Sequence, residues 1–160
     1  MAYPAAVIAN FFISKAKQCG QELTPMKLIK LVYLAHGWCL GLESKPLIDE
    51  PVVAWQFGPV VESLYHDFKR FGNDQITAFA GDHERAMEAL GQDKITLAIL
   101  ERVWEVYGSY SAVQLSNLTH KPGSPWDVAW NKEQGKNSRN HCIQNSLIRD
   151  YYAKQAEKRQ

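Results

Sequence analysis

Hydrophobic residues in this chain recur every three or four positions over several long stretches, which is the spacing of an α-helix. The longest stretch, residues 26–40, is apolar around most of its circumference, and Lys27 and Lys30 form its one polar stripe. A helix of this kind is expected at the centre of a domain. Thr24–Pro25 predicts its start, because a hydroxyl cap followed by proline suits a first helical turn, and Gly41 predicts its end.

The same spacing predicts further helices on both sides of this one. Most begin at a residue that suits an N-cap and end near a glycine. Their expected ranges are 4–19, 59–71, 82–91, 93–107, 112–118 and 125–131, with a last helix from residue 143. At Asp93, Ser111 and Ser124 a short polar side chain precedes an apolar helical run, so these three residues are the expected caps.

Residues 52–57 predict a β-strand, because they are rich in valine and aromatic side chains and follow a turn-forming segment. Leu47–Ile48 is the expected partner strand of a hairpin, and residues 75–79 are a candidate third strand. The strands and helices do not alternate as in a parallel nucleotide-binding sheet. The expected fold is therefore mainly α with a small antiparallel β-hairpin or three-stranded sheet, an α+β domain built on a central buried helix.

The chain length of 160 residues suits one compact domain, which we expect to cover residues 1–160. Residues 131–140 are polar and rich in glycine, lysine and asparagine, so they are expected to form a loop. Residues 153–160 are mostly charged or polar, and we expect this C-terminal end to fray.

Charge is nearly balanced, with 18 Lys and Arg against 17 Asp and Glu. Such a balance creates no overall field that would favour nucleic acid or an anionic membrane. The N-terminus lacks the pattern of a secretory signal, and residues 28–42 are too short and too interrupted to span a bilayer. Three scattered cysteines without a Cys-x-x-Cys pair suit a reducing compartment. We therefore expect a cytoplasmic protein without membrane or nucleic-acid partners.

Metal and catalytic sites find little support in the sequence. His36 and Cys39 lie three positions apart on the expected central helix, which suits two zinc ligands, but no second pair of ligands is evident. A buried thiol beside a hydrogen-bonded histidine is the favoured interpretation. The common motifs of nucleotide-binding proteins, zinc proteases and serine hydrolases do not occur. We expect no metal, no cofactor and no enzymatic activity.

Trp55 and Trp126 differ from the other tryptophans, because they fall on short expected elements that cannot bury both faces. Aromatic side chains in such positions suit anchors of protein–protein contacts. They equally suit a satellite core beneath the hairpin, and both interpretations stay open.

Three separate blocks of the sequence point to one family. They are residues 23–37 (Leu-Thr-Pro-Met-Lys-Leu-Ile-Lys-Leu and onward), residues 55–65 (beginning Trp-Gln-Phe-Gly-Pro) and residues 115–126 (beginning Leu-Ser-Asn-Leu-Thr-His and ending Ser-Pro-Trp). In type and spacing these blocks resemble the Panacea domain, the SocA-like antitoxin domain that is also seen in GepA-type phage-associated proteins. The resemblance covers residues 5–130, most of the chain.

The resemblance implies a non-enzymatic binding module that neutralises, by direct contact, a toxin encoded nearby as part of a bacterial or prophage type II toxin–antitoxin pair. One branch of the family resembles a proteolytic adaptor that carries its toxin to a ClpXP-type protease, and a homo-oligomer also stays open. We place the expected contact surface at the hairpin and the helix faces beside it, with Lys27, Lys30, Trp55, Gln56 and Trp126 as contact residues. The alternative function is a DNA-binding phage or prophage regulator, which needs a contiguous basic face.

Overall fold

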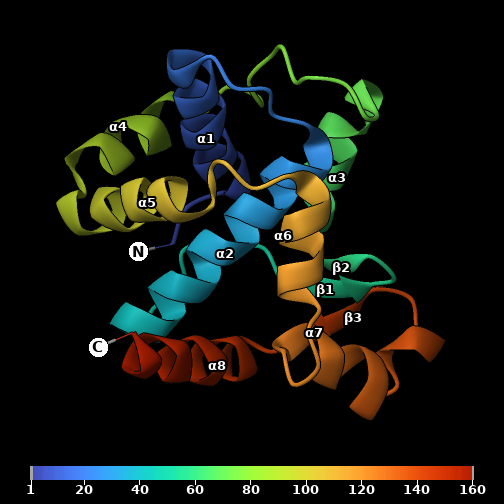
Figure 1. Cartoon of the computed structure of the whole chain (residues 1–160). Helices are drawn as coiled ribbons and strands as arrows, with labels where there is room; N and C mark the ends of the chain where they lie inside the picture. Colours follow the sequence, from blue (N-terminus) through green and yellow to red (C-terminus); the bar gives the residue numbers. More distant parts are fainter. Residues whose placement is uncertain (1, 160) are drawn as a thin grey trace.

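The computed structural model describes residues 2–159 of the chain, and its fold is mainly helical with one small antiparallel sheet, as predicted (Figure 1). A 3-10 turn follows α3, a π turn follows α7, and a second 3-10 turn lies within the loop before β3. The main elements are α1 Ala5–Cys19, α2 Pro25–Glu43, β1 Val52–Trp55, β2 Gly58–Val60, α3 Glu62–Phe68, α4 Glu84–Gln92, α5 Lys94–Tyr107, α6 Ala112–Thr119, α7 Pro125–Asp127, β3 His141–Ile143 and α8 Asn145–Lys158.

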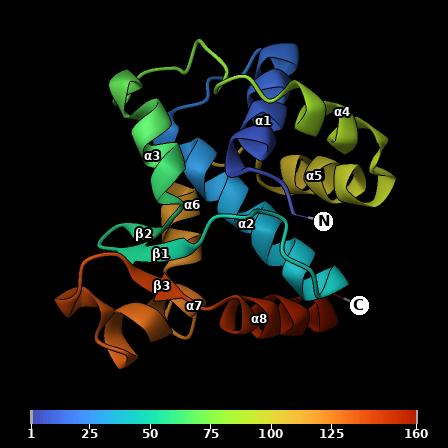
Figure 2. The same cartoon turned by 180° about the vertical axis from the view of Figure 1, so that it is seen from behind.

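Helix α2 lies at the centre of the domain, between α5, α6 and α8, in both opposite views (Figures 1 and 2). Residues 27–40 of this helix are all buried, which confirms the central helix expected from its apolar circumference. Gly41 does not end the helix, as was predicted, because α2 continues to Glu43. A Cβ atom at Gly41 would lie only 2.7 Å from the backbone carbon of Tyr152, so this glycine lets α8 approach α2 closely.

Three helix starts confirm the expected caps, whereas the Thr24 hydroxyl makes no capping hydrogen bond at the start of α2. The Asp93 carboxylate accepts a hydrogen bond from the backbone N–H of Thr96, and Ser124 accepts one from Asp127. Ser111 forms a complete capping box with Gln114. These bonds satisfy backbone donors that the first helical turn leaves free.

The sheet differs from the expected one in two of its strands. Its order is β2-β1-β3, and both pairs are antiparallel. The hairpin partner of β1 is Gly58–Val60, which was predicted to open a helix, and β3 comes from a segment for which no strand was predicted. Gly58 adopts a φ of 122°, a conformation that L-residues rarely adopt, and this lets the chain reverse after Gln56 and Phe57.

The two other strand predictions are wrong. Ile48 forms only an isolated parallel bridge with Tyr3, and Leu47–Ile48 does not pair with β1. Residues 75–79 form no strand, although the backbone N–H of Ile76 donates a hydrogen bond to the carbonyl of Leu23. Short apolar runs carry too little periodicity to separate strands from buried irregular segments.

The C-terminal part contains two short turns, a strand and a helix. Residues 131–140 include the end of a π turn and the 3-10 turn Gly135–Asn137. Helix α8 runs from Asn145 to Lys158, and Gln160 lies outside the described residues. That residues 131–140 form a loop and that the C-terminal end frays both stay predictions. Across residues 2–159, no helix has both the length and the hydropathy that a bilayer crossing requires.

Candidate interaction surface at the hairpin

The turn between β1 and β2 presents a large hydrophobic side chain to solvent. Gln56 and Phe57 form this turn, and Phe57 is 65% exposed. Met26 at the start of α2 and Tyr65 on α3 are each 40% exposed. All three line one hollow, and exposed hydrophobic side chains that gather in this way suggest an interaction site more strongly than single exposed residues do.

Side chains from three helices hold the backbone of this hairpin. Their donors come from α2, α6 and the start of α7, and each acceptor is a hairpin carbonyl oxygen. The three bonds run from Trp126 Nε1 to Trp55 O (2.6 Å), from Ser116 Oγ to Phe57 O (2.8 Å) and from Lys30 Nζ to Pro59 O (2.9 Å). The turn that carries Phe57 is therefore fixed before any partner arrives, which lowers the entropy cost of binding.

Lys30 is buried, with 2% of its surface exposed, so its expected place on a polar stripe is wrong. Its Nζ lies beneath the turn, where a Cβ atom at Gly58 would come within 2.7 Å of it. Burial lowers the pKa of Lys30 to about 7. The aliphatic stem of a lysine packs well in an apolar layer when its amine finds an acceptor, and here that acceptor is the carbonyl of Pro59.

Lys27 is also buried, with 8% exposure, and it does not reach the hairpin. Its Nζ donates a hydrogen bond to the carbonyl of Gly108 and lies 5.8 Å from the centre of the Trp104 ring. Burial lowers the pKa of this amine as well. The expected polar stripe of α2 is therefore absent, and both lysines tie α2 to neighbouring segments.

Trp126 belongs to the interior, with 7% exposure. Its ring stacks on Trp130 at a centroid distance of 5.6 Å and meets His120 edge-on at 5.2 Å. Of the two interpretations left open for this residue, the satellite core beneath the hairpin is the one that its burial supports. Its indole N–H supports the hairpin from below through Trp55 O.

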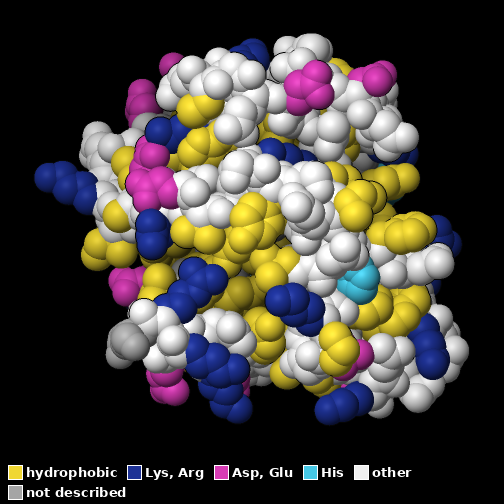
Figure 3. All heavy atoms as spheres, in the orientation of Figure 1, with side chains coloured by type: hydrophobic (Ala, Val, Ile, Leu, Met, Phe, Trp, Pro, Cys, Tyr) yellow, Lys and Arg dark blue, Asp and Glu magenta, His cyan; other side chains and the backbone are white. Residues whose placement is uncertain are grey.

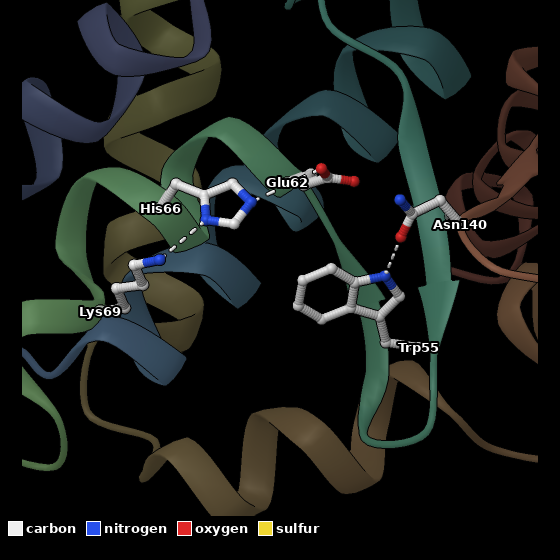
Figure 4. A network of polar contacts seen from close by, with 5 residues as sticks. All are labelled: Trp55, Glu62, His66, Lys69 and Asn140. Carbon is white, nitrogen blue, oxygen red and sulfur yellow. Dashed lines mark hydrogen bonds and ion pairs between the residues drawn. The ribbon is translucent and has the colours of Figure 1, made fainter.

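Trp55 is partly exposed and divides the surface into two hollows. Its Nε1 donates to Asn140 Oδ1 at 2.8 Å, and its ring lies edge-on to Tyr65 at 5.0 Å (Figure 4). One hollow, of about 390 Å³, lies on the side of Trp130 and Arg139, and the other, of about 250 Å³, lies on the side of Met26 and Phe57. Both hollows share Trp55 and Tyr65, so they form one continuous surface around this pair.

Polar groups border these hollows on α3. His66 Nδ1 accepts a hydrogen bond from Lys69 Nζ at 3.3 Å, while its Nε2 lies 3.5 Å from Glu62 Oε1 (Figure 4). We call the exposed set around the two hollows the hairpin surface. It comprises Met26, Trp55, Gln56, Phe57, Tyr65, His66, Lys69 and Arg139.

Trp55 and Gln56 are the members of this surface that the sequence predicts as contact residues; it does not predict the others. Phe57 falls within the expected strand 52–57, Met26 within the expected helix 26–40 and Tyr65 within the expected helix 59–71. The position of Phe57 directly before Gly58–Pro59 is the signal that could have marked it as a turn residue.

His36 and Cys39 have structural roles. His36 Nδ1 accepts from the backbone N–H of Leu47 (3.2 Å), so Nε2 carries the proton that is donated to Asn145 Oδ1 (3.0 Å). Burial lowers the pKa of His36 and raises that of the Cys39 thiol to about 11. In the part of the chain that the structure describes, no group of three His, Cys, Asp or Glu side chains is arranged to hold a metal ion.

Comparisons with known proteins place this fold in a family. The family model described as "Antitoxin SocA-like, Panacea domain" matches residues 28–127, which run from α2 through the hairpin to α7. Antitoxin SocA of Caulobacter vibrioides (strain NA1000 / CB15N) is 33% identical over 132 residues, which cover 79% of this chain and 70% of that protein. No solved structure matches the chain. The chain belongs to the SocA-like antitoxin family and carries its Panacea domain.

Proposed function

We propose that this protein is a non-enzymatic antitoxin that neutralises a cognate toxin protein, encoded nearby, by direct contact through the hairpin surface. Family membership supports the antitoxin role. The observation that supports this contact site is Phe57, which is 65% exposed on a turn held by three side-chain hydrogen bonds. A rigid, exposed aromatic side chain is the type of residue that dominates binding energy at interfaces.

The five contact residues predicted from sequence have different roles in this proposal. Trp55 and Gln56 touch the toxin directly, because both reach the surface of the hairpin. Lys30 and Trp126 act from within by holding the hairpin carbonyls. Lys27 contributes only to the packing of α2 against the segment after α5. Delivery of the captured toxin to a ClpXP-type protease would add a second partner to the same scaffold.

The alternative of a DNA-binding regulator needs a contiguous basic face, and the lysines of the expected polar stripe do not contribute to one. Lys27 and Lys30 are buried and donate to backbone carbonyls. Buried amines cannot reach the phosphates that dominate nucleic-acid affinity. Direct protein contact is therefore the better-supported function.

Co-expression with the product of the adjacent gene tests the proposal. We expect a stable complex and rescue of growth when that product is toxic. Phe57→Asp should weaken the complex at least about 30-fold, since a charge would replace a central apolar anchor. Phe79→Asp is the matched control, because Phe79 is also exposed (49%) but lies outside the hairpin surface.

Two outcomes count against the proposal in different ways. If neither complex nor rescue is seen with the wild-type chain, the antitoxin function is contradicted. If the complex forms and Phe57→Asp binds as well as Phe79→Asp, the function stands and the hairpin surface is wrong.

A further inference from the structure

A second apolar hollow, of about 270 Å³, lies away from the hairpin surface and shares no lining residue with it. Helix α2 forms its floor, and α5 and α8 form its walls. In Figure 3, hydrophobic side chains gather in the gap between these two helices, with Lys and Arg side chains beside them. We call this hollow the α5–α8 groove. Its lining residues are Trp38, Leu42, Ile99, Arg102, Val103, Val106, Tyr107, Ala156 and Arg159.

Helix α5 has two apolar stripes, and the rest of the domain fully buries one of them. Its inner face, including Leu100 and Trp104, is buried against the core. A second stripe is less covered: Ile99 and Val106 line the groove and are partly exposed, and Ile95, just beyond the groove, is 63% exposed. This stripe extends for about 16 Å along α5, the length of three helical turns. A short helix laid along α5 would cover this stripe, with its side chains entering the groove at Ile99 and Val106.

An arginine is held at the mouth of this groove. The Arg159 guanidinium lies 4.9 Å from the centre of the Trp38 ring, and its Nη2 donates to Tyr107 Oη at 3.5 Å. None of the ion pairs among residues 2–159 occupies Arg159. A stacked guanidinium keeps its remaining N–H donors in a fixed plane, which favours a carboxylate as ligand.

The charge around the groove also favours an acidic partner. Two charged side chains line the groove, Arg102 and Arg159, and both are cationic, although the whole chain is nearly neutral. Arg102 pairs with Glu105 on α5, so Arg159 is the lining cation without an ion-pair partner among residues 2–159. The smaller hollow beyond Ile99 is lined by Glu43, Asp93 and Lys45, so it offers no excess of positive charge.

We propose that the α5–α8 groove binds an amphipathic helix of a partner protein, whose apolar side chains cover Ile99 and Val106 and whose Asp or Glu side chain pairs with Arg159. This interaction is separate from the hairpin surface and does not depend on the function proposed for it. A chain with both surfaces holds two proteins at once.

A display library of random peptides of about 16 residues, long enough for four helical turns, tests this proposal on the full chain. Selection uses the wild-type protein, with counter-selection on Ile99→Asp, which places a charge in the groove. We expect enriched peptides with apolar residues at i, i+4 and i+7 and an acidic residue one turn away. No enrichment over Ile99→Asp, or enrichment of basic peptides, contradicts the proposal.

A synthetic peptide from the selection then separates the roles of charge and shape. Arg159→Gln should weaken its affinity about tenfold or more, because a charge-assisted hydrogen bond is lost. Arg149→Gln, on α8 but outside the groove, should leave the affinity unchanged; Arg159 is the C-cap residue of the same helix. The NMR resonance of the Trp38 indole N–H, which donates to Tyr107 Oη, should shift on binding to the wild-type chain. Equal affinity for Arg159→Gln and Arg149→Gln, or binding that leaves the Trp38 resonance in place, overturns the proposal.

Discussion

Lys30 on α2 donates a hydrogen bond from Nζ to the carbonyl oxygen of Pro59 in β2, 2.9 Å away, and this bond joins the centre of the domain to the hairpin. The amine sits where only 2% of the residue is exposed, and burial lowers its pKa to about 7. One side chain thus supports the hairpin and carries a pH-dependent charge in the core.

The first prediction concerns stability between pH 7 and pH 9. The folded-state pKa of Lys30 is about 7, against an ordinary value of 10.5, so the unfolded chain holds a proton that the folded chain releases. The free energy of unfolding should therefore rise over this range, by at most about 2 kcal/mol. Urea unfolding at several pH values should show a smaller rise for Lys30→Met than for Lys45→Met, an exposed control. If the free energy of unfolding rises equally with pH in both variants, the burial of the Lys30 amine is contradicted.

The second prediction concerns the stability of the domain at acidic pH. His36 is held neutral, because Nδ1 accepts from a backbone N–H and burial lowers the pKa of the ring. Since the unfolded histidine takes up a proton first, stability should be lost as the pH falls below about 6.5, by up to about 1.4 kcal/mol per pH unit. His36→Gln should reduce this loss, whereas His66→Gln, on the surface, should retain it. Thermal unfolding between pH 5 and pH 7 measures how much stability each variant loses. If His36→Gln loses as much stability as the wild-type chain, groups other than His36 cause the loss.

The third prediction concerns the contact of α2 with α8. Gly41→Ala should destabilise the domain by about 1–3 kcal/mol, because the new Cβ would lie 2.7 Å from the backbone of Tyr152. Gly91→Ala in α4 is the control, since nothing lies within 4 Å of a Cβ atom there. It should be neutral or stabilising by up to about 1 kcal/mol, as alanine favours a helix. Chemical denaturation of both variants should show opposite signs, and two equal stabilities would contradict the close packing.

The fourth prediction concerns the rigidity of the hairpin. Ser116→Ala removes the donor to Phe57 O and leaves the Phe57 side chain in place. Amide exchange at residues 56–58 should become faster, and affinity for the toxin should fall about fivefold through the cost of ordering the turn. Hydrogen exchange and calorimetry measure these two effects. Ser146→Ala, an exposed position on α8, should change neither. Faster exchange with unchanged affinity would show that the toxin does not use the turn.

Residues near a helix end illustrate what the sequence predicts well. Asp93, Ser111 and Ser124 were expected as caps, and each accepts a hydrogen bond from an N–H three residues later. The hairpin surface is an example of what the sequence predicts poorly. Trp55 and Gln56 were identified from residue type, but Tyr65 has helical spacing that resembles a core position while 40% of it is exposed. Which face of α3 is covered depends on segments far from it in the chain.

The sequence by itself determined the central helix, the three caps and the family, because periodicity and capping depend on neighbours within one or two turns. Tertiary structure alone decided that β3 joins β1 and that Lys30 is buried. Cys142 of β3 lies opposite Val53 of β1, although the two are far apart in the sequence. The amine of Lys30 donates to the carbonyl of Pro59, which is 29 residues away. A strand edge or a buried charge is stabilised only by the group that finally lies beside it, and distant parts of the chain supply that group.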